Sequence, residues 1–300
     1  MATSEKRDAT DASCANCAST GQVSRTHPIS EMAGEMISAA WVAAEPVAES
    51  TDHLINFDAH VLKRGIKGLE AARLLVGAGY WENATSVARQ LFELLVNMEH
   101  LGSFADRKKA CGIHNAFGLL QHFLAEARRI EFEKGRGRPA DSPWETSVKD
   151  FLNNHCADFR LSPRPDGSAR WRTSWSGKTT RALAEASPDP MRVAQYEMLF
   201  STWSEQTHAT PGVFATDLFI RYEDEILDEA LAEIDGVPPE VMREISGVGR
   251  REVQTLGMTS LLCLQLWQQL PNVRQPSPDE CSRWQSAIKR HAATKGLPIF

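Results

Sequence analysis

The sequence predicts an all-α protein, a multi-helix bundle built on a long antiparallel helical hairpin. Apolar residues recur at helical spacing over several long stretches, and no stretch shows the strict alternation typical of a half-buried β-strand. Of the 300 residues, 42% are hydrophobic, which is enough for at least one sizeable core. A single helical domain with appendages and a two-domain arrangement both fit this length.

The hairpin is expected near residues 53–101. Its first helix should end around Gly77 and Gly79, because glycine readily adopts the left-handed conformation found just beyond a helix C-terminus. A second helix follows from about Glu82, and its apolar residues cover more than half of the helix circumference. Such a helix is expected to be buried on several sides. Two long helices joined by a short turn form an antiparallel hairpin.

The remaining helices follow from the same periodicity and from composition. Their expected ranges are 106–134, 143–154, 191–208, 214–234, 251–270 and 279–294. Pro211 prevents simple continuation of the helix that ends at His208, since proline lacks the amide hydrogen that a helix interior needs. The chain is therefore expected to be helical along most of its length.

Three parts of the chain are predicted to differ in organisation. Residues 1–30 contain almost no large apolar side chains and are expected to be a disordered N-terminal tail. Residues 31–270 form the helical bundle domain, which includes an irregular basic loop at 157–177. Residues 271–300 form a linker and a C-terminal helix.

The cysteines and the N-terminal sequence indicate a cytoplasmic protein. The six cysteines are scattered along the chain, so a disulfide framework is not expected. Cys14 and Cys17 lie close together in the tail, but a zinc site would need two more ligands at suitable spacing. The N-terminus lacks the apolar run of a secretory signal, and no apolar stretch approaches the roughly 20 residues that cross a bilayer. We therefore expect no membrane association.

Composition and motifs exclude several classes of function. The net charge of −6 gives no global electrostatic reason for nucleic-acid binding. No segment matches a P-loop, a dinucleotide-binding glycine motif, a zinc-protease helix or a serine-hydrolase elbow. We therefore expect no cofactor and no metal.

The second hairpin helix carries Arg89 and Glu93 one turn apart. With Ser86 and His100 they form a narrow polar face opposite the apolar one. An exposed ion pair that supports the helix is the simplest interpretation. However, arginine before glutamate is the less stabilising order, and the helix is largely apolar, so part of a functional site is the alternative.

The helix expected at 191–208 carries a second polar row, which includes Ser204 and His208. This row borders the apolar face of the helix, to which Tyr196 belongs. A half-buried histidine beside a packed face can act as a tuned acid or base. His208 also lies in the expected last turn, where the helix dipole favours its protonated form. A histidine that merely complements the dipole is the alternative.

A basic segment at 160–181 holds six Lys or Arg residues and one acid, Asp166. Guanidinium groups alternate with indoles in it, a combination that can bind phosphates and stack on bases. The same composition occurs at protein–protein interfaces and in loops that bind nothing. The nucleic-acid-binding residues predicted from it are Arg170, Trp171, Arg172, Trp175 and Lys178.

The stretch from Leu74 to Leu101, together with Tyr196 and the later residues 204–208, resembles an uncharacterised bacterial all-helical family, known only as a domain of unknown function. The similarity covers roughly residues 50–220. More distantly, the pattern resembles the HEPN helical domains of bacterial toxin and phage-defence ribonucleases. Those domains have an arginine a few residues before the histidine, whereas the nearest earlier arginine on this helix is Arg192.

The HEPN resemblance implies a dimeric protein that acts on RNA in a bacterial toxin or phage-defence system, as a metal-independent ribonuclease. His208 would be the general acid or base, Arg89 would stabilise the charge on phosphorus, and Glu93 would orient Arg89. Ser204 and Tyr196 would position the phosphate. The implied partners are RNA, a second copy of the chain and a defence-system protein.

Two other classes of function fit the same residues. The first is a non-catalytic helical scaffold, or a protein that binds a ligand or partner, in which the polar row supports the bundle. The second is a metal-dependent hydrolase that uses Glu93 and His208 with His53 or His60. The sequence alone does not bring Arg89 and His208 together in space.

Overall fold

The computed structural model describes residues 27–45, 51–137, 142–203 and 248–292. These residues are almost entirely α-helical, with one two-stranded sheet, so the all-α prediction is confirmed. None of the helices within the described ranges is long and apolar enough to span a bilayer. Residues 1–26 of the expected tail, the expected helix at 214–234 and residues 204–208 lie outside the described ranges. The prediction of a disordered tail up to residue 30 was wrong at its last residues, because a helix begins at Pro28 and buries Ile29 and Ser30.

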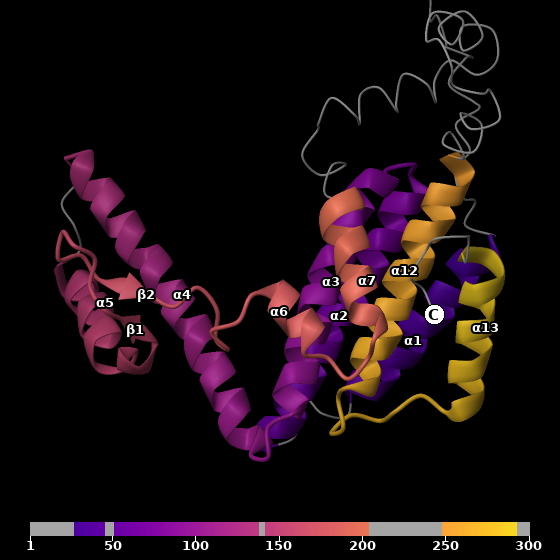
Figure 1. The fold of residues 1–300 in the computed structure, drawn as a ribbon, viewed down its shortest axis with the longest axis horizontal. Helices are drawn as coiled ribbons and strands as arrows, with labels where there is room; N and C mark the ends of the chain where they lie inside the picture. Colours follow the sequence, from indigo (N-terminus) through magenta and orange to yellow (C-terminus); the bar gives the residue numbers. More distant parts are fainter. Residues whose placement is uncertain (1–26, 46–50, 138–141, 204–247, 293–300) are drawn as a thin grey trace, which may run out of the picture.

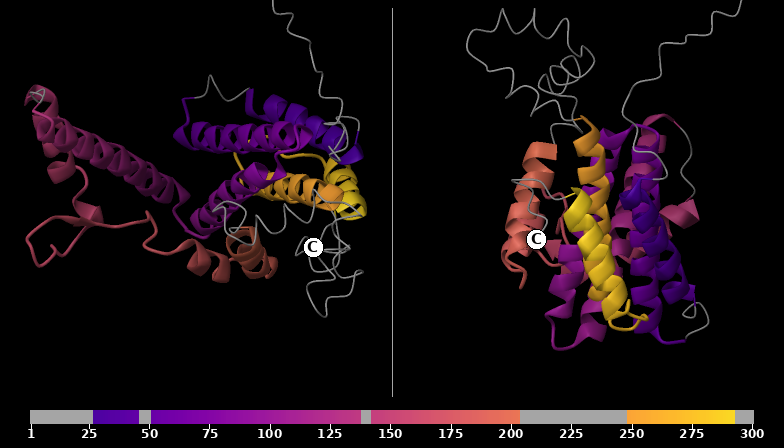
Figure 2. Two further views of the ribbon diagram at one scale, coloured as in Figure 1. Left: turned by 90° about the horizontal axis from the view of Figure 1, so that it is seen from above. Right: turned by 90° about the vertical axis from the view of Figure 1, so that its right-hand side faces the viewer.

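A bundle of long helices forms the body of the molecule (Figures 1 and 2). Its members are α1 (Pro28–Ala44), α2 (His53–Gly77), α3 (Trp81–Gly102), α12 (Val248–Gln268) and α13 (Pro278–Ala292). Helix α12 packs against all four of the others. The C-terminal helix belongs to the same core, because Trp284 is buried and its ring lies 6.1 Å from that of Trp267.

Helices α2 and α3 form the predicted hairpin, and a glycine turn joins them. The amide of Tyr80 donates to the carbonyl of Leu75 at 2.8 Å, and that of Gly79 donates to the carbonyl of Val76 at 3.0 Å. This pair of bonds is a Schellman motif. Gly79 has a φ of 83°, a left-handed conformation that glycine adopts without steric cost.

An arm projects from the base of the bundle (Figure 1). Helix α4 (Arg107–Gly135) leads outward, and α5 (Ser142–Asn154), the 3-10 helix η2 (Ala157–Phe159) and strands β1 (Arg160–Leu161) and β2 (Arg170–Trp171) pack near its far end. The arm has its own aromatic core, in which Phe123 stacks on Phe151 with ring centroids 3.9 Å apart. The prediction of a wholly irregular loop at 157–177 was therefore wrong in part, because β1 and β2 pair antiparallel within it.

The chain returns from the arm to the bundle along α3 (Figure 1). Helix α6 (Thr180–Glu185), which the sequence did not predict, leads to α7 (Met191–Glu197). A π-helical turn, η3 (Met198–Thr202), follows directly. The helix expected from residue 191 is therefore interrupted by wider π geometry before the described range ends at residue 203.

Candidate functional site

One face of α3 carries a row of polar side chains, here called the α3 polar stripe. Its members are Arg89, Glu93, Asn97 and His100, whose spacing of three or four residues places them on one side of a helix. The opposite side of α3 is packed into the core, with Leu91 and Leu95 almost fully buried. The returning chain contacts the stripe at Arg89 and at Asn97.

At one end of the stripe, Arg89 meets the aromatic side of α7 and η3. Its guanidinium carbon lies 4.4 Å from the ring centroid of Phe200, within the range of a cation–π interaction. Phe200 in turn stacks on Tyr196, with centroids 4.7 Å apart and planes 13° from parallel. The structure therefore joins the predicted residues Arg89 and Tyr196 through Phe200.

The π turn lies directly at this contact. Phe200 is within η3, and Tyr196 lies just before it. Single π turns inside α-helices are rare and occur often at functional sites. A wider turn also changes which later side chains follow Tyr196 on the same side of the helix. Ser204 and His208 come after η3, outside the described residues.

Glu93 occupies the middle of the stripe. Although it is exposed at the surface, desolvation raises the pKa of its carboxyl, while the nearby charge of Arg89 opposes that rise. Its main-chain oxygen accepts a hydrogen bond from Asn97 Nδ2 at 2.6 Å. Glu93 thus has a carboxyl that takes up a proton more readily than an ordinary glutamate, beside an arginine.

Trp175 covers the other end of the stripe. Its Nε1 donates to Asn97 Oδ1 at 2.5 Å, and its ring lies 5.5 Å from His100 and 5.4 Å from His114. Only 7% of Trp175 is exposed. Its indole therefore anchors the returning loop to α3 and α4, and this conformation offers no open ring face for stacking on a base.

The folded protein lowers the pKa values of the two histidines around Trp175. Burial lowers the pKa of His100, and the charge of Lys178 lowers it further. Burial also lowers the pKa of His114, against a hydrogen bond with Asn115. Lys178, predicted to bind nucleic acid, is exposed beside this end of the stripe.

The other predicted nucleic-acid-binding residues lie on the arm. Arg170 and Arg172 are exposed, and Trp171 is half-buried with the guanidinium of Arg160 5.0 Å from its ring centroid. The structure thus divides the predicted basic set into two places. Arg170, Trp171 and Arg172 belong to the small hairpin, whereas Trp175 and Lys178 belong to the stripe.

A buried ion pair that sequence reasoning missed holds α7 against α3. Arg192 Nη2 lies 2.6 Å from Glu99 Oε1, and both side chains are 2% exposed. Arg192 Nη1 also donates to Gln195 at 2.8 Å and to Gln265 of α12 at 3.0 Å. Ser187 Oγ donates to the second Glu99 oxygen at 2.8 Å. The network fixes the helix that carries Tyr196 and Phe200 relative to the stripe.

A further ion pair holds the base of the arm. Asp58 of α2 is fully buried and accepts hydrogen bonds from the two terminal nitrogens of Arg107, Nη2 at 2.6 Å and Nη1 at 3.1 Å. It also accepts hydrogen bonds from the main-chain and side-chain amides of Asn272, at 3.0 and 2.8 Å. Such a satisfied carboxylate has a structural role. Within the described ranges, no three His, Cys, Asp or Glu side chains are grouped closely enough to hold a metal ion.

The hairpin and the helices packed on it make this an all-helical protein. A family model described as a family of unknown function (DUF5677) matches residues 59–226. The chain belongs to this family, and the match covers most of the hairpin, the arm and the helix that carries Tyr196. Searches of curated proteins and of solved structures found no match.

Proposed function

We propose that this protein is a HEPN-like, metal-independent ribonuclease of a bacterial toxin or phage-defence system, acting as a homodimer with a defence-system partner. The observation that supports the proposal best is the meeting of Arg89 and Tyr196 through Phe200. These residues come from α3 and α7, more than one hundred positions apart. Arg89 and the hydroxyl of Tyr196 can donate hydrogen bonds to phosphate oxygens. Glu93, whose pKa is raised, lies beside Arg89.

The proposed chemistry is attack of an RNA 2′-hydroxyl on the adjacent phosphorus. His208 removes the proton of that hydroxyl, the bond from O2′ to phosphorus forms, and the bond from phosphorus to O5′ breaks. Solvent protonates the leaving 5′-oxygen, and the product carries a 2′,3′-cyclic phosphate. Arg89 stabilises the negative charge that builds up on the phosphoryl oxygens.

The other site residues position the reacting groups. Glu93 orients Arg89, and Tyr196 with Ser204 holds the phosphate. These roles require only side chains, so the proposal needs no metal or cofactor.

The arm supplies a second reason to favour RNA. The hairpin and its turn expose four arginines, Arg160, Arg164, Arg170 and Arg172. The acid among them, Asp166, accepts a hydrogen bond from the amide of Ser168 at 2.8 Å. Exposed arginines bind the phosphate backbone of nucleic acids without regard to sequence, so this hairpin suits the holding of a strand.

A cleavage assay with the double variant Arg89→Ala/His208→Ala tests the proposal. The wild-type protein should cleave a fluorogenic RNA, and the double variant should lose cleavage while its circular dichroism stays unchanged. Arg64→Ala is the matched control, because Arg64 is exposed on α2 and, among the described residues, donates a hydrogen bond only to Gln90, at 3.4 Å. Equal cleavage by wild type and double variant would remove this site.

A non-catalytic scaffold or partner-binding protein is the second candidate. It is favoured by the burial of Trp175 on the stripe and by the packing of Arg89 on Phe200, since cation–π contacts also serve stability alone. In that case Arg89→Ala lowers the melting temperature and changes no turnover. The metal-dependent hydrolase is less favoured, and metal analysis of the purified protein tests it directly.

A further inference from the structure

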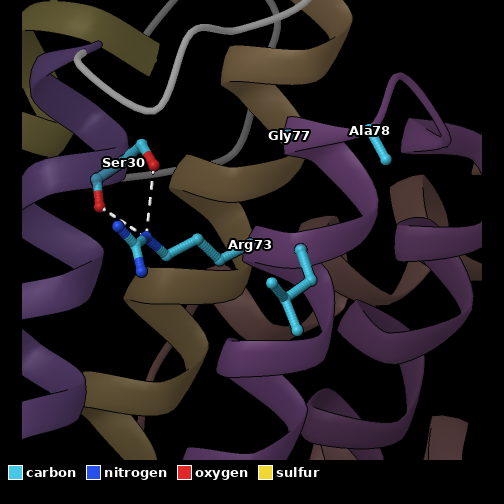
Figure 3. Close-up of a pocket in the computed structure, with 5 residues that line it drawn as sticks. Ser30, Arg73, Gly77 and Ala78 are labelled. Carbon is cyan, nitrogen blue, oxygen red and sulfur yellow. Dashed lines mark hydrogen bonds between the residues drawn. The ribbon is translucent and has the colours of Figure 1, made fainter.

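A small cavity lies between the N-terminal turn of α1 and the C-terminal end of α2 (Figure 3). Its volume is about 240 Å³. The residues that line it are Ser30, Arg73, Leu74, Gly77 and Ala78. The proposed RNA site on the α3 polar stripe shares none of these residues.

Arg73 is held in a fixed orientation at this cavity. Its Nε donates to the carbonyl oxygen of Ser30 at 2.8 Å and to the hydroxyl of Ser30 at 3.2 Å (Figure 3). The guanidinium also lies against Gly34, where an added Cβ would be 3.3 Å from Arg73 Cζ. The absence of a side chain at Gly34 therefore leaves room for the guanidinium beside α1.

The two outer nitrogens of Arg73 remain available. Within the described ranges they donate to no acceptor, and no carboxylate lies within ion-pair distance of them, including that of Glu70 one turn earlier. Arg73 is only half-exposed. A partly buried charge is costly unless it is paired and hydrogen-bonded, so this guanidinium favours an anionic partner.

The acids of α1 do not pair with Arg73. Glu35 is paired with Arg283 at 3.0 Å, and Glu31 is exposed in the first turn of α1. His27 caps the start of α1, and its ring lies 5.8 Å from that of His291. Burial and the charge of His291 lower the pKa of His27. The charge that could bind an anion at this cavity is therefore that of Arg73.

We propose that this cavity binds a small oxyanion attached to a short apolar group, such as a short-chain carboxylate or an alkyl phosphate. The outer nitrogens of Arg73 form the planar fork that binds two oxygens of a carboxylate or phosphate. Leu74 and Ala78 supply the apolar wall, and Gly77 leaves open space at the cavity, since a Cβ there would meet no atom within 4 Å.

Calorimetric titration of the full chain tests the site. The probes are butyrate, butyl phosphate and the neutral butyramide. Saturable binding of either anion without binding of butyramide supports the proposal, and the preferred anion distinguishes a carboxylate from a phosphate ligand. Arg73→Gln should weaken that binding by at least about tenfold, the loss expected for charge-assisted hydrogen bonds, whereas Arg64→Gln should leave it unchanged.

A second pair of variants avoids any effect of losing Arg73 on folding. An added Cβ at Gly77 would meet no atom within 4 Å, so Gly77→Glu and Gly77→Gln should both fold. A glutamate there lies one turn after Arg73, at i,i+4 spacing, so it would pair with Arg73 and compete with the probe, while the glutamine would not. Loss of binding in Gly77→Glu alone supports the site. No saturable binding to the wild type, or equal binding by both Gly77 variants, overturns it.

Discussion

Arg192 and Glu99 form a buried ion pair across α7 and α3, with Nη2 and Oε1 2.6 Å apart and 2% of each side chain exposed. The network around them reaches α12 through Gln265. Three helices are therefore tied at one point, and the position of Tyr196 and Phe200 on the α3 polar stripe depends on it. A buried pair of this kind contributes little net stability as a pair, but its disruption is costly.

Replacing one partner of this pair should destabilise the fold strongly. Arg192→Ala leaves Glu99 buried without its counter-charge, and the free energy of unfolding should fall by about 3–5 kcal/mol. Urea unfolding measures this change. Arg181→Ala is the control, because its ion pairs with Glu185 and Glu197 are both exposed and exposed pairs contribute little to stability. Similar losses in both variants would contradict the structural role of Arg192.

Tyr196→Phe separates a catalytic hydroxyl from a packing ring. The substitution keeps the stack on Phe200, so the melting temperature should change little. If the hydroxyl positions the phosphate, RNA cleavage should fall by about tenfold or more, the scale of losing a hydrogen bond to a charged group. An unchanged cleavage rate would leave Tyr196 with packing alone.

Acidification should loosen the loop that Trp175 anchors. The folded state lowers the pKa values of His100 and His114, so the unfolded chain binds more protons. Their stabilising contribution is present above the ordinary histidine pKa of about 6.5 and is lost as the pH falls through and below that value. Hydrogen exchange of residues 172–179 should therefore accelerate on acidification, corrected for the intrinsic rate. The variant His100→Gln/His114→Gln should flatten this response, and an equal response in both proteins would contradict it.

Gly257→Ala should destabilise the bundle where α12 meets α13. A Cβ at this position would overlap the Cβ of Ala292, and overpacking of this kind costs about 1–3 kcal/mol. The higher helix propensity of alanine returns up to about 1 kcal/mol. The compensating variant Gly257→Ala/Ala292→Gly should recover the melting temperature in a thermal scan. A single variant as stable as wild type would indicate that α13 sits further from α12.

The hairpin could be predicted because its signals are local. Periodicity marks α2 and α3, and Gly79 marks the turn with its left-handed φ. Strands β1 and β2 could not be predicted, because strands of two residues are too short to show an alternation of apolar and polar side chains. The loop 157–177 was accordingly expected to be irregular.

Only part of the candidate site could be predicted from the sequence. The face shared by Arg89 and Glu93 follows from helix geometry, but the meeting of Arg89 with Phe200 depends on tertiary packing and on the π turn. The contact between Glu99 and Arg192 spans 93 positions, and no pattern in either helix indicates it. An acid on the apolar side of α3 was the one available signal, since a buried acid needs a partner.

Analysis of RNA cleavage products in the presence of excess EDTA tests the central claim most directly. The wild-type protein should cleave RNA and leave 2′,3′-cyclic phosphate ends, because the proposed reaction uses only side chains and the 2′-hydroxyl. Arg89→Ala should abolish this product, and Arg64→Ala should not. Absence of cleavage by the wild type, cleavage that EDTA stops, or an equal yield of cyclic phosphate from Arg89→Ala would contradict the account.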